Sequence, residues 1–286
     1  MAKLSDYQSN DPIAWCPGCG NFGILEAVKL ALVDLNLEPY QVLIVSGIGQ
    51  AAKLPHYLRC NTFNGLHGRT LPVATAAKIA NHKLTVIAVS GDGDAYGEGG
   101  NHFLHALRRN IDITYLVHNN QVYGLTKGQV SPTSELGFVT KTTPFGAISP
   151  PLNPLALAIV MDAGFVARGF AGEIKHLAWL IQEGIRHKGF SLIDILQPCV
   201  SFNKVNTFKW YKYRIYKLEE EPKYDPTNRI LALQKSQEWG DRIPIGIIYR
   251  SNRKSFNEQL PAIKDVPLVE QKINLDKFPK LLEEFY

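Results

Sequence analysis

Two closely spaced cysteines near the start of the chain are the first residues whose spacing suggests chemistry. Cys16 and Cys19 lie in the segment WCPGCG, and the 286 residues contain only four cysteines. A Cys-x-x-Cys pair occurs in zinc sites, in thiol–disulfide sites and as half of an iron–sulfur site. A zinc site needs two further ligands. The next cysteine is Cys60, and the segment LHGR supplies one histidine, His67. The pair alone leaves all three kinds of site open.

The segment SGDGD, residues 90–94, predicts a binding site for a diphosphate. It follows an apolar run and precedes a helical pattern, so Gly91 and Gly93 lie where a strand ends. Glycines at this position allow a tight turn and a close approach of backbone N–H groups to a ligand. Asp92 adds a hard oxygen ligand, which would repel a phosphate unless a divalent cation bridges the two groups.

A pair of asparagines about 25 residues after Gly93 extends this pattern. The amide oxygen of Asn120 and the carbonyl oxygen of Val122 would complete a Mg²⁺ shell together with two phosphate oxygens. A GDG turn alone is a weak signal. GDG followed at this spacing by NN resembles the fingerprint of thiamine diphosphate enzymes. The dinucleotide-binding alternative fails, because no G-x-G-x-x-G follows the first expected strand.

The elements that would position these residues alternate between strands and helices. Apolar, β-branched runs predict strands at 41–45, 84–89, 113–117 and 191–196. Helical patterns lie between them, at 22–36, 98–108 and 174–187. This alternation predicts an α/β fold, a mostly parallel sheet flanked by helices on both faces. The segments SGIG, SGDGD, HNNQVYG and QPC all follow expected strands, so we expect them to converge on one crevice.

The remaining segments are less regular. Residues 128–155 are rich in Pro, Thr, Ser and Gly and predict a long loop, and EWGDRIPIGIIYR is one more apolar segment. The last 35 residues are expected to form a tail. We therefore divide the chain into a cofactor-binding domain, 1–201, and a C-terminal extension, 202–286, packed on the core or on a partner subunit.

Composition excludes several classes of protein. The net charge is +5 and the pI about 8.9, but no run of Lys or Arg exceeds two residues, so nucleic acid binding is not predicted. The mild basic excess suits an anionic substrate or an acidic partner equally well. No apolar stretch is long enough to span a membrane, and the polar start MAKLSDYQSN is unlike a signal peptide. We expect a cytoplasmic protein without structural disulfides.

Several motifs together resemble one family. They are WCPGCGNFGILEA, SGIG, NGLHGR, GDGD, NNQVYGLTKGQ, DILQPC and EWGDRIPIGIIY, which span residues 15–249 in the family's order. They resemble the β subunit of 2-oxoacid:ferredoxin oxidoreductases, particularly the archaeal two-subunit type. The resemblance implies oxidative decarboxylation of a 2-oxoacid with coenzyme A to an acyl-CoA and CO₂. It further implies that the electrons pass through a 4Fe-4S cluster to ferredoxin.

The resemblance assigns roles to individual residues. It implies that Mg²⁺ is held by Asp92, Asn120 and the carbonyl of Val122. The residues expected to border thiamine diphosphate are Ile48, Gly49, Gln50, Ala51, His67, Gly93, Asp94, Gly124 and Leu125. His67, Lys53 and Lys127 are candidate catalytic residues, and the two lysines would anchor substrate carboxylates. The plainer alternatives are a packing role for the histidine and solvated surface charges for the lysines.

The resemblance also answers the question raised by the cysteine pair, though incompletely. Cys16, Cys19 and Cys199 match three of the family's four cluster ligands, whereas Gln50 stands where the family has its other cysteine. Cys60 is the spare cysteine, but if residues 51–59 are helical it lies about 15 Å from position 50. Three outcomes remain open. Cys60 is the fourth ligand, the cluster has three cysteines with a non-cysteine or vacant corner, or the cluster is lost.

Partners and competing functions follow from the same resemblance. The family's partner α subunit, or fused γα subunit, supplies the glutamate that activates thiamine diphosphate, so we expect the chain to be inactive alone. One alternative is a thiamine diphosphate-dependent decarboxylase or synthase subunit with a lost or altered cluster. A second is a non-catalytic scaffold that binds zinc at Cys16 and Cys19, against which the GDGD and NN spacing argues.

Overall fold

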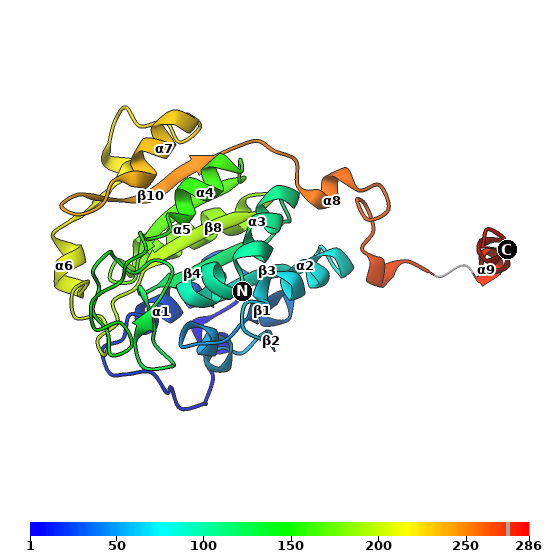
Figure 1. Cartoon of the computed structure of the whole chain (residues 1–286). Coiled ribbons are helices and arrows are strands. Elements are labelled where there is room, and N and C mark those ends of the chain that lie inside the picture. Colours follow the sequence, from blue (N-terminus) through cyan, green and yellow to red (C-terminus); the bar gives the residue numbers. More distant parts are fainter. Residues whose placement is uncertain (273–274, 286) are drawn as a thin grey trace.

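The core of the protein is one eight-stranded sheet. The structure is a computed structural model, and it describes residues 1–272 and 275–285. The strands lie in the order β2 (Asn61–Asn64), β1 (Val42–Ser46), β3 (Thr85–Gly91), β4 (Thr114–Asn119), β8 (Ser191–Leu196), β7 (Phe165–Phe170), β10 (Ile243–Arg250) and β9 (Ile215–Lys217). Neighbouring strands are parallel except for the antiparallel pair β7 and β10. This confirms the predicted fold class, and the four predicted strands are β1, β3, β4 and β8 (Figure 1).

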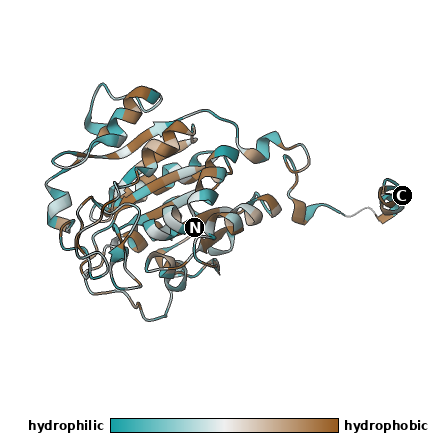
Figure 2. Ribbon diagram, in the orientation of Figure 1, coloured by the Kyte–Doolittle hydropathy of each residue, from teal (hydrophilic) through white to brown (hydrophobic). Residues whose placement is uncertain are grey.

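Helices cover both faces of the sheet and enclose two hydrophobic cores. Helices α1 (Asn21–Asp34) and α5 (Ile174–Arg186) pack on one face, against strand residues such as Ile87 and Ile193. Helices α2 (Thr70–Ala80), α3 (Gly100–Arg109), α4 (Pro154–Val160) and α7 (Arg229–Gln237) pack on the other face. Strands β4, β7 and β8 are buried along their whole length, as a parallel sheet covered on both faces requires. Figure 2 shows these central strands as predominantly hydrophobic.

Two local predictions differ from the structure. The helix expected at 98–108 is α3, but a π-helical segment, Gly93–Glu98, precedes it and starts two residues after β3 ends. The residues after SGIG form a 3-10 helix, Ala51–Tyr57, which contains Pro55. Both changes lie beside the expected crevice. There the chain has to turn tightly rather than continue a regular helix.

The C-terminal part of the chain joins the same sheet. Residues 131–153 contain no regular helix or strand, in agreement with the predicted loop. Beyond α6 (Phe208–Lys212), strands β9 and β10 extend the sheet that residues 1–201 begin. After β10 come the short helices α8 (Phe256–Gln259) and α9 (Phe278–Glu283). Within the described ranges, none of the helices is both long and apolar enough to cross a bilayer.

Candidate cofactor site

A cavity of about 120 Å³ lies where the carboxyl ends of β1, β3 and β4 meet. From β1 the chain continues outward to β2 and then crosses back to β3, so the cavity lies at a switch point of the sheet. All residues that the sequence assigned to the cofactor line it, as do the three assigned to Mg²⁺. Gly91, Tyr123 and Thr126 complete the lining. Segments separated by up to about 75 residues in sequence are therefore brought together as expected.

Two glycines keep the cavity open. A Cβ atom at Gly93 would lie 2.2 Å from the ring of Tyr123, so no side chain fits at this turn. Gly49 has a φ of +123°, a conformation that other residues rarely adopt. Backbone at both positions can thus approach a ligand that a side chain would exclude.

Of the two carboxylates that line the cavity, that of Asp92 has fewer donors from the protein. Its side chain is buried and accepts hydrogen bonds from the hydroxyls of Ser131 at 2.5 Å and Thr133 at 2.7 Å. Burial raises the pKa of Asp92 to about 6, because desolvation penalises its charged form more than these bonds favour it. Asn120 and Val122 line the same cavity and add an amide and a carbonyl oxygen. A set of oxygen ligands that includes a buried carboxylate with a raised pKa fits Mg²⁺.

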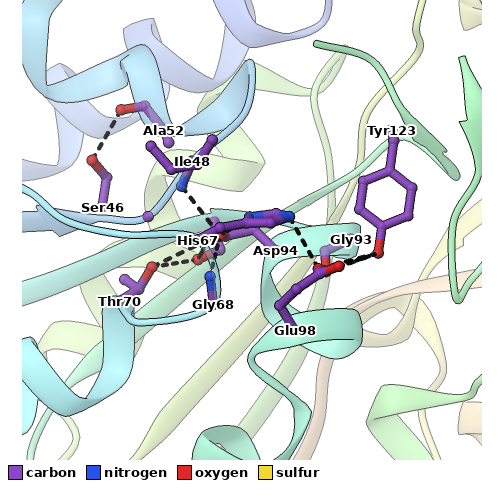
Figure 3. Close-up of polar contacts among 12 residues, drawn as sticks. Ser46, Ile48, Ala52, His67, Gly68, Thr70, Gly93, Asp94, Glu98 and Tyr123 are labelled. Carbon is purple, nitrogen blue, oxygen red and sulfur yellow. Dashed lines mark hydrogen bonds and ion pairs between the residues drawn. The ribbon is translucent and has the colours of Figure 1, made fainter. Parts of the chain in front are cut away.

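The carboxylate of Asp94 has a different task. It is also buried, but five donors from the protein surround it: Ile48 N, His67 Nδ1, Gly68 N, Thr70 Oγ1 and Ser90 Oγ. These donors come from the ends of β1 and β3 and from the segment that leads into α2 (Figure 3). Asp94 therefore borders the cavity as predicted, but its side chain joins three segments of chain and is not free to contact a ligand.

His67 lies between two carboxylates. Its Nδ1 is 2.7 Å from Asp94 Oδ1, and its Nε2 is 3.0 Å from Glu98 Oε2. The hydroxyl of Tyr123 donates to Glu98 at 3.2 Å, and its ring lies near the imidazole (Figure 3). The histidine is thus part of a polar cluster at the edge of the cavity. These contacts suit a hydrogen-bonded packing residue, and a catalytic role for His67 stays a prediction.

The two lysines do not line the cavity. Lys53 is half-buried in the 3-10 helix after β1, and Lys127 is exposed. Lys127 also has a φ of +78°, a left-handed conformation within the turn between β5 (Val122–Tyr123) and β6 (Gln129–Val130). Their suggested contact with substrate carboxylates stays a prediction.

A second, smaller cavity holds three of the four cysteines. Cys16, Cys19 and Cys199 line it together with Gln50, which also lines the cofactor cavity. Burial raises the pKa of Cys19 to about 11, although Gln197 donates a hydrogen bond to its sulfur at 3.3 Å. Among the described residues, no three His, Cys, Asp or Glu side chains are arranged closely enough to hold a metal ion. Three thiols and the Gln50 amide line the cavity, but these thiols are not arranged as a ready metal site.

Cys60 does not join this set. It lies beyond the 3-10 helix, in a different cavity beside Asp6 and Tyr40, and packs against the hydrophobic core. Burial raises its pKa to about 12, so it stays a neutral thiol. This contradicts Cys60 as the fourth cluster ligand and leaves it as a partly buried apolar side chain. A thioredoxin-like site is also disfavoured, because residues 1–20 form no strand ahead of α1.

Four polar side chains around His67 and Asp92 were given no role in the sequence analysis. Glu98, Tyr123, Ser131 and Thr133 contact His67, Asp92 or each other. A signal was present for the hydroxyls, because the segment SPT follows the asparagine motif closely. No pattern distinguished Glu98 from the other acidic residues, since its role depends on a contact across 31 residues of sequence.

Comparison with known proteins agrees with this geometry. Residues 44–195 match the family described as thiamine pyrophosphate enzyme, C-terminal TPP binding domain. Residues 199–265 match the C-terminal region of the pyruvate ferredoxin oxidoreductase beta subunit. The chain is 49% identical to a 2-oxoacid:ferredoxin oxidoreductase subunit beta of Saccharolobus solfataricus, over 86% of this chain and 84% of that one. It is 41% identical to a second such subunit, from Aeropyrum pernix, over 96% and 94% of the two chains.

This chain belongs to the family of 2-oxoacid:ferredoxin oxidoreductase β subunits. A solved structure supports the assignment at the level of the fold. It is 2-oxoglutarate:ferredoxin oxidoreductase from Magnetococcus marinus with 2-oxoglutarate, coenzyme A and succinyl-CoA bound. The TM-score is 0.91 at 34% identity, and the match covers 99% of this chain and 96% of that one. The β subunit described here therefore carries a thiamine diphosphate-binding domain, and that domain contains the whole cofactor cavity.

Proposed function

We propose that this β subunit, with a partner α or fused γα subunit, converts a 2-oxoacid and coenzyme A to an acyl-CoA and CO₂ and passes the electrons to ferredoxin. The observation that carries the proposal is the cavity at the ends of β1, β3 and β4, whose lining contains the complete predicted set for thiamine diphosphate and Mg²⁺. The cofactor supplies the nucleophilic carbon and the electron sink for decarboxylation. We also infer a cytoplasmic location, which the four free thiols support.

The protein side of this chemistry consists of binding and orientation. Asp92, Asn120 and the carbonyl of Val122 would hold the cation, which neutralises the diphosphate in a site whose own carboxylates would otherwise repel it. At the turn at Gly93 the backbone would face the diphosphate. The side chains of Ile48 and Leu125 form an apolar part of the cavity wall. A cation at Asp92 would also relieve the cost of burying that carboxylate.

We infer that electrons leave through an iron–sulfur cluster at the three-cysteine cavity. Gln50, Asn120 and Gly124 line both this cavity and the cofactor cavity, so only one layer of residues separates them. Cys16 and Cys19 lie shortly before α1, and Cys199 lies shortly after β8. The three thiols therefore come from two segments that are far apart in the sequence. Three thiolates with Gln50 at the fourth corner would hold a cluster whose potential and oxygen sensitivity differ from those of a four-cysteine site.

Two features support a requirement for the partner subunit. Among the described residues that line the cofactor cavity there is no glutamate, the residue type needed to activate thiamine diphosphate in this family. The loop after β6 also exposes five large apolar side chains, namely Leu136, Val139, Phe145, Ile148 and Leu152. Exposed apolar groups gathered on one loop are typical of a protein interface.

The proposal is tested by co-expressing the chain with its genomic neighbour, purifying the complex anaerobically and titrating it with thiamine diphosphate and Mg²⁺. We expect saturable binding that Asp92→Asn weakens about 100-fold, because the amide is a far poorer cation ligand. Asp241→Asn is the matched control, since Asp241 is exposed. Equal binding by the wild type and Asp92→Asn would contradict the cofactor site.

Iron content and ferredoxin reduction decide the second half of the proposal. A reduced-cluster EPR signal together with oxoacid-dependent ferredoxin reduction supports electron transfer. Thiamine diphosphate binding with near-zero iron would instead favour a decarboxylase or synthase subunit. The position of Gln50 favours this decarboxylase or synthase function, because it places an amide where a four-cysteine cluster needs a thiol.

A further inference from the structure

The imidazole of His67 is held at both nitrogens by carboxylates. Nδ1 lies 2.7 Å from Asp94 Oδ1, and Nε2 lies 3.0 Å from Glu98 Oε2 (Figure 3). An ionised carboxylate only accepts hydrogen bonds, so each ring nitrogen has to carry a hydrogen to satisfy its partner. Both ring nitrogens of His67 are therefore placed as hydrogen-bond donors to carboxylates.

The two carboxylates hold the ring with unequal strength. The Asp94 side chain is 1% exposed and is fixed by four further donors, so its contact with Nδ1 is part of the fold. The Glu98 side chain is 45% exposed, and its other described contact is the hydroxyl of Tyr123 at 3.2 Å. If a ligand competes for one N–H of His67, the one at Nε2 is therefore released first.

The backbone brings Glu98 to His67 and keeps it there. Gly68 has a φ of +72°, and a Cβ atom at this position would lie 2.6 Å from the carbonyl carbon of Glu98. The segment that contains His67 thus packs directly on the π-helical segment Gly93–Glu98. That segment begins with cavity-lining residues and ends with Glu98, so the contact is tied to the shape of the cofactor site.

The charge of His67 matters because of where the ring lies. It is the one side chain able to carry a positive charge among the described residues that line the cavity, which also holds Asp92 and Asp94. Arg69, two residues along, contacts His102 instead. A positioned cation stabilises an oxygen that gains negative charge, as the carbonyl oxygen of a 2-oxoacid does when a nucleophile adds to its carbon.

We propose that Glu98 is a positioning residue that keeps the Nε2 proton on His67, so that the imidazolium can donate a hydrogen bond to the carbonyl oxygen of a bound 2-oxoacid. This inference rests on the proposed function for the identity of the ligand. The relationship between Glu98 and His67 is a property of the free chain and can be measured without a ligand.

The test compares Glu98→Gln with Glu220→Gln, which removes the same charge from an exposed position outside the site. The free chain is labelled with ¹⁵N-histidine, and His67 is assigned by the signal lost in His67→Gln. At pH 7.5 we expect both His67 nitrogens to be protonated in the wild type and in Glu220→Gln. In Glu98→Gln we expect Nε2 to lose its proton, because a glutamine amide can donate to it. Glu98→Ala, which removes the side chain, should behave in the same way.

Turnover of the assembled complex provides the second measurement. We expect Glu98→Gln to lower kcat at pH 7.5 about tenfold, with KM for the oxoacid changed less than about twofold and with partial recovery of kcat at pH 6. Identical ¹⁵N spectra and kinetics for the Glu98 and Glu220 variants in an active complex would overturn the inference and leave the proposed function standing. If the wild-type complex binds no thiamine diphosphate, the proposed function fails, whereas the ¹⁵N spectra still decide the role of Glu98.

Discussion

The buried carboxylate of Asp94 accepts the backbone N–H of Ile48 at 3.1 Å, which ties the turn after β3 to the turn after β1. The same carboxylate accepts the backbone N–H of Gly68 at 2.7 Å, from the segment that leads into α2. A Cβ atom at Gly47 would lie 2.1 Å from Asp94 Oδ2, so the neighbouring turn is also shaped around it. One side chain thus sets the relative position of three walls of the cofactor cavity.

We predict that Asp94→Asn destabilises the chain by about 3 kcal/mol. An asparagine keeps one acceptor oxygen and adds an NH₂ group, which has to face buried donors that then lose their partner. Urea denaturation of the free chain measures the change. Asp241→Asn is the control for loss of a carboxylate, because Asp241 is exposed, and we expect little change in its unfolding midpoint. A midpoint for Asp94→Asn equal to that of the control would show that the five donors contribute no net stability.

Gln50→Cys should convert the three-cysteine cavity into a four-cysteine one. Gln50 lines this cavity beside Cys16, Cys19 and Cys199, so a thiol at this position would give the cavity four cysteine side chains. We expect the variant complex, purified anaerobically, to bind more iron than the wild type and to lose it more slowly in air. Iron and sulfide analysis with EPR provides the measurement.

Cys60→Ser is the matched control for the cluster experiment. Cys60 lies in a different cavity, so its removal should leave iron content unchanged. Loss of iron in Cys60→Ser, or no gain in Gln50→Cys, would mean that the ligands are not those that line the cavity.

The free energy of unfolding should depend on pH through the protonation of His118. This side chain is fully buried in β4, and burial lowers its pKa to about 3, while Asn21 lies 2.8 Å from its Nδ1. Because the folded-state pKa lies below the unfolded value of 6.5, the unfolded chain binds more protons between these values. The stabilisation is complete above pH 6.5 and is lost as the pH falls, by about 1.4 kcal/mol per pH unit.

Urea denaturation between pH 7.5 and 5.5 measures this slope. Acidification from pH 7.5 to pH 5.5 should lower the free energy of unfolding of His118→Gln by about 1.4 kcal/mol less than that of the wild type. His56→Gln, at an exposed position, should follow the wild type. Parallel curves for the wild type and His118→Gln would contradict the prediction.

Most regular apolar segments were predictable, although helix α4 was missed, and three other missed elements break a pattern. Strand β7 contains Arg168, which is buried and donates to the carbonyl of Ser236 at 3.2 Å, so its sequence FVARGF does not look like a core strand. Helix α2 carries a proline, Pro72, in its first turn, where the missing N–H costs no helical hydrogen bond. Strand β2 is exposed along its length and has no apolar face to detect.

The convergence of the cofactor residues was determined by the sequence alone. Each motif follows a β-branched run, and parallel strands place their carboxyl ends at one edge of a sheet. The motifs therefore lie close together even though they are far apart in the sequence. Family resemblance then assigned the chemistry. The resemblance also separated the two carboxylates of this turn, because it assigned Asp92 to Mg²⁺ and Asp94 to the border of thiamine diphosphate.

Only the tertiary structure decided which groups hold each of these two carboxylates. Asp92 receives two hydroxyl donors and keeps a raised pKa, while Asp94 receives five donors from segments that sequence spacing cannot align. The same holds for the separation of Cys60 from the other cysteines and for the contact between Glu98 and His67. The charge and reactivity of a buried group depend on which groups pack around it, and that is a property of the assembled fold.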